Sequence, residues 1–228
     1  MTRTHAENLN SRKNGRSLTA VGLGFAFLEI LKQVYLIRNV FGGSYDVWYV
    51  PFQLCSMPIY LCLTAGISGL SGKNKSPEGL RTVILTFLMD YGLLGGVMAL
   101  TVRDGFTFPE HPLLTAHGWV WHIGMIALAL WIFFRGLGDT SVKGYLKTIP
   151  VFLVLAAFAE IINVSLHGKG DCDMFYISPY HLSSQPVFVD IDAAVGRPAG
   201  IVIYVLAVCF GAFLSHIIFN LIRLAKER

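Results

Sequence analysis

Six long apolar runs constrain this chain more than any other feature of its sequence. Each is close to the roughly 20 residues that an α-helix needs to cross the hydrocarbon core of a bilayer. Charged residues make up only 14% of the 228 residues, against about 25% in an average soluble domain. The sequence therefore predicts an all-α, polytopic membrane protein with six transmembrane helices in one bundle, residues 17–222, flanked by tails at 1–16 and 223–228. The predicted helices are 17–37, 47–69, 79–102, 112–134, 146–167 and 198–222.

The distribution of Lys and Arg predicts the orientation of this bundle. Thirteen of the 18 lie in or beside the two tails and the second and fourth connections, and only four lie in the other connections. Because cytoplasmic connections carry the excess positive charge, we expect a multi-pass protein of the cell membrane with both termini in the cytoplasm. The first apolar run is too long for a signal peptide, so we expect it to be retained. The basic residues are assigned to topology, and no nucleic-acid partner is predicted.

The second apolar run, VWYVPFQLCSMPIYLCLTAGISG, carries residues that burial in lipid does not require. It contains Gln53 and Cys55 between prolines at 51 and 58. Pro58 lacks an N–H and clashes with the carbonyl of Leu54, so the pattern predicts a kink with unbonded backbone beside Cys55. Such backbone survives at membrane depth only where it packs on protein or lines a wet cavity. We therefore interpret Cys55 as a candidate nucleophile, with packing as the alternative.

The four cysteines predict neither a disulfide framework nor a metal site. Cys55, Cys62, Cys172 and Cys209 include no CxxC pair and no zinc-ligand spacing. Cys62 and Cys209 have no polar context and are interpreted as packing residues. No cofactor is predicted.

Ionisable residues inside spanning helices are costly, so they indicate either a functional site or a buried pair. Their depths suggest that they converge. At 1.5 Å per residue, Cys55 lies about 12 Å and His117 roughly 7 to 8 Å below the outer ends of their helices. Together with polar residues on the first, third and fifth helices, including Asp90, they predict one cavity biased toward the outer side. We expect the substrate to contact Glu29, Lys32, Gln33, Gln53, His122, Glu160, Asn163 and Tyr176.

The connection 168–197 contains an unusual segment, GDCDMFYISPY, at residues 170–180. Its aromatic and aliphatic residues predict that it folds back onto the bundle or the membrane interface. It then either covers the cavity or anchors at headgroup depth. Asp171 and Asp173 are only weak evidence for calcium.

Three motifs resemble a known family. VPFQLCSMP, with Cys55, resembles the LPLxLC segment of the YwaF-like family of bacterial six-helix membrane proteins. PLLTAHGWVWH, with His117, resembles that family's helix-start histidine, and DMFYISPY resembles its NYMFLxxxP loop. The order and spacing agree from about residue 17 to residue 222. Asp173 stands where Asn is usual, and Phe52-Gln53 where Leu-His is frequent.

The resemblance implies a chemistry. The YwaF-like family is similar to the transmembrane protein 164 family, described as Cys- and His-dependent lipid acyltransferases. In design it also resembles the androgen-induced membrane hydrolases of fatty-acid esters, which pair a Thr nucleophile with His. For this chain the resemblance implies Cys55 as nucleophile and His117 as base.

Three functions follow as hypotheses. The first is a membrane-embedded lipid acyltransferase or lipid ester hydrolase that acts on a membrane lipid. The second is a transporter with an ion or proton relay through Glu29, Lys32, Asp90 and Glu160. The third is a non-catalytic lipid-binding bundle. The sequence specifies no oligomeric state.

Overall fold

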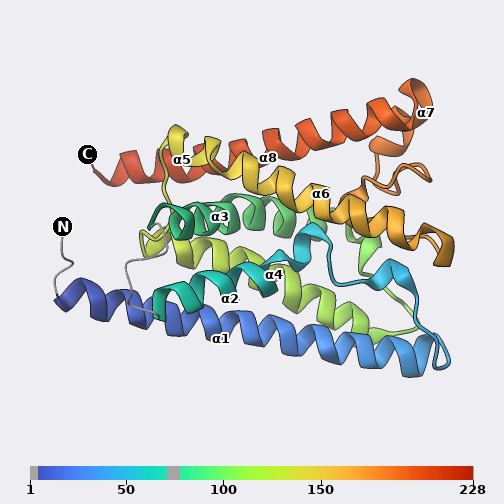
Figure 1. Ribbon diagram of the computed structural model, residues 1–228, viewed down its shortest axis with the longest axis horizontal. Coiled ribbons are helices and arrows are strands. Elements are labelled where there is room, and N and C mark those ends of the chain that lie inside the picture. The colour runs from blue at the N-terminus through green and yellow to red at the C-terminus, as the bar shows by residue number, and fades with distance from the viewer. Residues whose placement is uncertain (1–4, 71–77, 228) are drawn as a thin grey trace.

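The chain folds into a bundle of long helices, and no strand occurs in the part that the structure describes. The structure is a computed structural model that describes residues 5–70 and 78–227. The all-α, polytopic class predicted from the sequence is confirmed. The helices are α1 (His5–Tyr35), α2 (Met57–Leu70), α3 (Glu78–Thr101), α4 (Pro112–Phe134), α5 (Val142–Leu146), α6 (Thr148–Leu166), α7 (Phe188–Val195) and α8 (Arg197–Lys226) (Figure 1).

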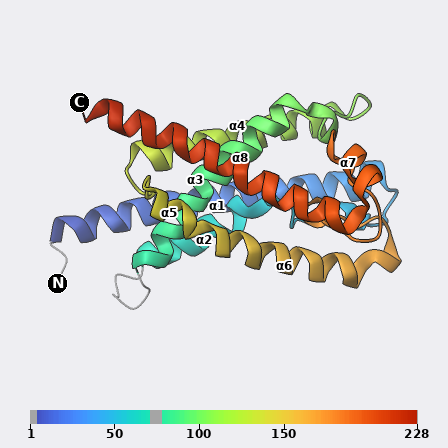
Figure 2. The ribbon, with the colours of Figure 1, turned by 90° about the horizontal axis from the view of Figure 1, so that it is seen from above.

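The long helices lie roughly side by side, so the bundle has two ends (Figures 1 and 2). The terminus end carries the start of α1, the end of α8 and residues 135–147. The loop end carries residues 41–53, 102–111 and 167–196. Within the described residues, five helices are long and apolar enough to cross a membrane, and a sixth apolar helix is shorter.

The first helix begins earlier than predicted. It starts at His5 rather than at residue 17 and ends in a π-helical turn, Leu36–Val40. Residues 5–16 therefore form the first turns of α1, where Asn14 is buried and accepts a hydrogen bond from Arg135 Nη2 at 2.9 Å. A Cβ on Gly15 would lie 2.9 Å from the Gly66 carbonyl, so the absence of a side chain lets α1 and α2 pack backbone to backbone. Residues 1–4 lie outside the described part of the chain.

The second run is not one kinked helix. Residues Val47–Tyr49 and Leu54–Ser56 form separate 3₁₀ turns, and α2 begins only at Met57. Pro58 therefore lies in the first turn of α2, where a missing N–H costs nothing, and the predicted mid-helix kink is wrong. The 14 residues of α2 cover about 21 Å. The irregular backbone of residues 47–56, which we call the Cys55 segment, leads from the loop end into this helix.

The remaining boundaries agree more closely. The helix at 112–134 is confirmed, and α3 and α8 start within a residue of the prediction. The predicted helix 146–167 corresponds to α6, and the short helix α5 before it was not predicted. Helix α8 runs to Lys226, into the predicted tail. Helix α7 was missed, since it lies in the connection expected to be irregular. The basic residues counted at positions 73 and 75 lie outside the described part of the chain.

A row of aromatic rings connects the bundle centre to the loop end. Phe87 stacks on Tyr91 with ring centroids 4.3 Å apart, and Tyr91 stacks on Phe152 at 5.2 Å. Phe152 stacks on Phe175, which stacks on Phe52, both at 6.1 Å. This row packs the segment before Cys55 and the long connection against the bundle.

Candidate functional site

Cys55 lies in the 3₁₀ turn Leu54–Ser56, just before α2. Gln53 is the N-cap of this turn in an extended conformation, with ψ 160°. The N–H groups of Leu54 and Cys55 open the turn, where a helix has no intrahelical acceptor for them. The carbonyl of Cys55 accepts a hydrogen bond of 3.0 Å from the indole Nε1 of Trp121 on α4. The residue is half-buried.

His117 lies one turn before Trp121 on α4. Its ring packs against the Trp121 ring, with centroids 5.2 Å apart and planes inclined by 32°. Its Nε2 atom is buried and has no hydrogen-bond partner among the described residues. Trp121 therefore contacts both predicted catalytic residues, the backbone of Cys55 and the ring of His117. No direct hydrogen bond joins the thiol to the imidazole in the described part of the chain.

A polar cluster on α1 lies beside this pair. Glu29 Oε1 accepts a hydrogen bond from Gln33 Nε2 at 2.6 Å and pairs with Lys32 Nζ at 2.8 Å. The Gln33 amide also donates to the carbonyl of Tyr49 at 2.6 Å, which ties α1 to the segment before Cys55. The Cys55 thiol and the His117 ring both lie within electrostatic range of Lys32 and Glu29. The α1 cluster thus borders the same region as Cys55 and His117.

Gln53 connects Cys55 to the long connection. Its Nε2 donates to the carbonyl of Asp173 at 2.8 Å, and its Oε1 accepts from the N–H of Phe175 at 2.8 Å. The amide therefore binds backbone at both ends. We call residues 172–178 the strap, because this segment crosses from the Cys55 segment to α6 and α8. The prediction that it folds back onto the bundle is confirmed, while its role as a cover stays a prediction.

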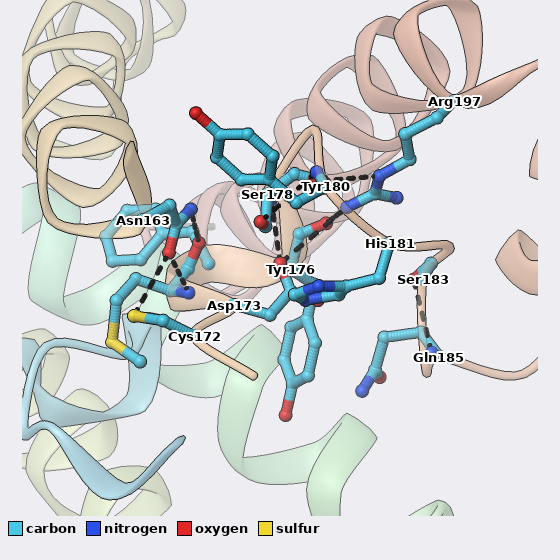
Figure 3. A network of polar contacts seen from close by, with 12 residues as sticks. Asn163, Cys172, Asp173, Tyr176, Ser178, Tyr180, His181, Ser183, Gln185 and Arg197 are labelled. Carbon is cyan, nitrogen blue, oxygen red and sulfur yellow. Dashed lines mark hydrogen bonds and ion pairs between the residues drawn. The ribbon is translucent and has the colours of Figure 1, made fainter. Parts of the chain in front are cut away.

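Asn163 holds the strap from α6 in a similar way. Its Nδ2 donates to the Met174 carbonyl at 3.1 Å, and its Oδ1 accepts from the Met174 N–H at 2.6 Å (Figure 3). Asn163 Nδ2 also contacts Glu160 Oε2 at 3.2 Å, and Cys172 Sγ lies 3.7 Å from Asn163 Oδ1. Asn163 and Glu160, predicted to bind substrate, thus lie beside the strap.

Arg197 holds the strap from the start of α8. Its guanidinium donates to the carbonyls of Ser178 at 2.7 Å and Tyr176 at 2.9 Å (Figure 3). It also pairs with Asp192 at 2.6 Å. The Asp173 carboxylate accepts from the Ser178 N–H at 2.7 Å. Burial raises the pKa of Asp173, while that N–H and Arg197 oppose the rise. From the sequence, Arg197 was used only as one of the four basic residues outside the predicted cytoplasmic connections, and no role in holding the strap was predicted.

The strap holds two strained residues. Phe175 and Tyr176 both have φ 58°, in the left-handed region that side chains other than Gly rarely adopt. Such strain persists where surrounding contacts overdetermine the backbone. Tyr176 packs against Trp48 and against Tyr204 of α8, each with ring centroids 6.3 Å apart.

Two of the residues predicted to line the cavity, His122 and Asp90, form hydrogen bonds with groups other than Cys55 and His117. The Nδ1 of His122 bonds to the carbonyl of Gly118 at 2.8 Å, and its ring packs on Phe106 at 5.0 Å. Asp90 pairs with Nδ1 of His216 at 2.9 Å, and Nε2 of that histidine lies 2.9 Å from the Ser141 carbonyl at the terminus end. The predicted convergence of Asp90 on the same cavity is therefore wrong, because its Oδ2 pairs with a histidine of α8 toward the terminus end. Its Oδ1 is buried without a hydrogen-bond partner among the described residues.

Trp121 is the site residue that sequence reasoning missed. It follows His117 by four residues, so both lie on one helix face, but the sequence does not specify which face meets the Cys55 segment. That spacing was the available signal. The hydrogen bond from Trp121 to the Cys55 carbonyl has no signature in the sequence, because any residue supplies a backbone carbonyl.

These features define an α-helical, polytopic membrane protein with a buried polar region between α1, α4 and the Cys55 segment. A family model matches residues 2–215, and the chain belongs to the TMEM164 family. No curated protein matches the sequence. No solved structure matches it either.

Proposed function

We propose that this protein is a membrane-embedded lipid acyltransferase or lipid ester hydrolase, with Cys55 as nucleophile and His117 as base. The observation that carries the proposal is Trp121, which donates to the Cys55 carbonyl at 3.0 Å and packs against the His117 ring with centroids 5.2 Å apart. The resemblance of the Cys55 and His117 motifs to Cys- and His-dependent acyltransferases supports the same roles. The proposed partner is a membrane lipid.

The proposed first half-reaction forms an acyl-enzyme. His117 Nε2 takes the thiol proton of Cys55, because the thiolate is the competent nucleophile. The thiolate attacks the carbonyl carbon of a lipid ester, the ester C–O bond breaks, and the leaving alcohol takes the proton from His117. The thiol must turn toward Nε2 when substrate binds, as catalytic hydrogen bonds often tighten only in the complex.

The proposed oxyanion donors are the N–H groups that open the 3₁₀ turn. Backbone donors aimed at the developing negative charge are an effective form of transition-state stabilisation. The N–H groups of Leu54 and Cys55 belong to the same 3₁₀ turn that carries the Cys55 thiol. The Gln53 amide is bound to the strap at both ends, so we assign it to positioning this turn.

The second half-reaction consumes the thioester. Water would release a fatty acid, and the hydroxyl of a second lipid would accept the acyl chain. With both termini in the cytoplasm, as the charge distribution predicts, the site at the loop-end half would open toward the outer leaflet.

Labelling with a thiol-reactive lipid probe tests the pair. We expect Cys55→Ser to abolish labelling of the wild-type site and His117→Ala to slow it about tenfold or more, in the range of general-base catalysis. Cys209→Ser is the matched control, since Cys209 is also half-buried but bonds to Tyr91. Equal labelling in all four proteins would contradict the proposal.

A further inference from the structure

Three buried polar atoms, two on α1 and one on α4, have no hydrogen-bond partner among the described residues, and their side chains belong to two helices that contact the Cys55 segment. They are Glu29 Oε2, Gln33 Oε1 and His117 Nε2. Glu29 is only 5% exposed, although it is one of the most expensive side chains to bury. Buried polar atoms are nearly always paired, so a group of orphans in one region indicates a ligand.

On α1, the internal hydrogen bonds engage only one oxygen of Glu29 and only the nitrogen of the Gln33 amide. Glu29 Oε1 already receives Lys32 at 2.8 Å and Gln33 Nε2 at 2.6 Å. Gln33 Nε2 is also bound by the Tyr49 carbonyl at 2.6 Å, so the internal bonds engage only the nitrogen end of this amide. One carboxylate oxygen and one amide oxygen are therefore left to accept hydrogen bonds from something else.

The three unpaired atoms are all hydrogen-bond acceptors, so they favour a ligand that is uncharged and donates hydrogen bonds. The charges of Glu29 and Lys32 cancel, so a second cation or an anion would lack a counter-charge. A carboxylate oxygen and an amide oxygen both accept only, and a neutral imidazole nitrogen accepts as well. Water and alcohols with more than one hydroxyl supply several O–H donors without charge.

We propose that Glu29 and Gln33 form an acceptor subsite that binds the hydroxyl compound which takes the acyl group from Cys55. This inference rests on the proposed function. The reacting O–H donates to His117 Nε2, and another donor of the same molecule is bound by Glu29 Oε2 and Gln33 Oε1. The subsite thus decides whether water or a lipid alcohol receives the acyl chain.

The step balances with these groups alone. His117 takes the hydroxyl proton while the oxygen attacks the thioester carbonyl. A new C–O bond forms and the C–S bond breaks. The Cys55 thiolate then takes the proton back from His117, which restores the resting thiol and a neutral imidazole.

The test separates acylation from deacylation in the full chain purified in detergent. With 4-nitrophenyl octanoate as donor, the initial burst of nitrophenol reports acylation of Cys55, and the later rate reports deacylation. We expect Glu29→Gln, which keeps an oxygen for Lys32 and Gln33 but replaces the other accepting oxygen by an amide, to keep the burst and to slow the later rate about tenfold. Asn39→Leu is the control, because Asn39 is exposed and bonds only to the Tyr35 carbonyl in the described structure.

Two acceptors then distinguish the ligand. Water enriched in oxygen-18 reports hydrolysis, and added monooleoylglycerol reports transfer to an alcohol. If the variant slows only hydrolysis, the subsite binds water, and if it slows only transfer to monooleoylglycerol, the subsite binds the alcohol. Either result supports an acceptor subsite. An unchanged later rate, or a burst slowed equally with it, overturns the subsite. If wild type gives no burst and Cys55 stays unmodified, the proposed function fails and the subsite with it.

Discussion

At the scale of single residues, the proposed reaction depends on Trp121, which links the Cys55 segment to His117 on α4. The sequence motifs indicated Cys55 and His117, but nothing in the pattern related one to the other. In the structure Trp121 relates them, since its N–H binds one residue and its ring packs on the other. Phe25 packs edge-on against the same indole at 4.9 Å, which restrains its orientation from α1. Trp121 is therefore a positioning residue in the proposed reaction.

Substitution of Trp121 separates its two contacts. Trp121→Phe keeps an aromatic ring for His117 and removes the hydrogen bond to Cys55, which is typically worth about 1 kcal/mol. We expect the labelling rate of Cys55 to fall about fivefold, and to fall further in Trp121→Leu. Trp119→Phe is the control on the same helix, because Trp119 is exposed. Identical rates in the Trp119 and Trp121 variants would refute a positioning role.

At the scale of elements, the strap is held by one side chain from each of three segments. Gln53 binds it from the Cys55 segment, Asn163 from α6 and Arg197 from α8. These bonds satisfy buried backbone groups and maintain two left-handed residues, Phe175 and Tyr176. We infer that the strap is a fixed wall rather than a hinged lid, because opening it would expose all of these donors and acceptors.

Asn163→Leu tests this anchoring. The substitution leaves the buried N–H of Met174 without a partner, at roughly 1–3 kcal/mol. The Met174 carbonyl keeps only the longer bond, 3.4 Å, from the Ile177 N–H. We expect a lower midpoint of thermal unfolding in detergent and faster proteolysis within residues 170–180. Ser165→Ala is the control, since Ser165 is exposed on the same helix. A midpoint like that of wild type would show that the strap does not depend on this amide.

At the scale of the whole molecule, the lengths of the apolar runs predicted most of the fold. The helix 112–134 was predicted to the residue, because Pro112 marks its first turn. The irregular backbone of residues 47–56 was predicted only in part, since two prolines signal a break but not that α2 starts after it. The pairing of Asp90 with His216 joins residues 126 positions apart, and no local pattern encodes such a partner.

The orientation of the bundle is a prediction at this scale. Both described ends of the chain lie at the terminus end (Figure 1), and the excess of Lys and Arg assigns that end to the cytoplasm. Reporter fusions that are active only in the cytoplasm should therefore be active after residue 228 and inactive when inserted at residue 168. The reverse pattern would place the Cys55 site on the cytoplasmic half.

Peptide mass spectrometry of the purified protein, after incubation with diacyl phospholipid vesicles, shows whether Cys55 forms an acyl-enzyme with His117 as base. The account predicts an acyl group in thioester linkage on the peptide that contains Cys55, removed by neutral hydroxylamine. It predicts that the adduct is greatly reduced in His117→Ala. An acyl adduct that forms equally without His117, or its absence from Cys55 in wild type while the lipid is turned over, would contradict the account.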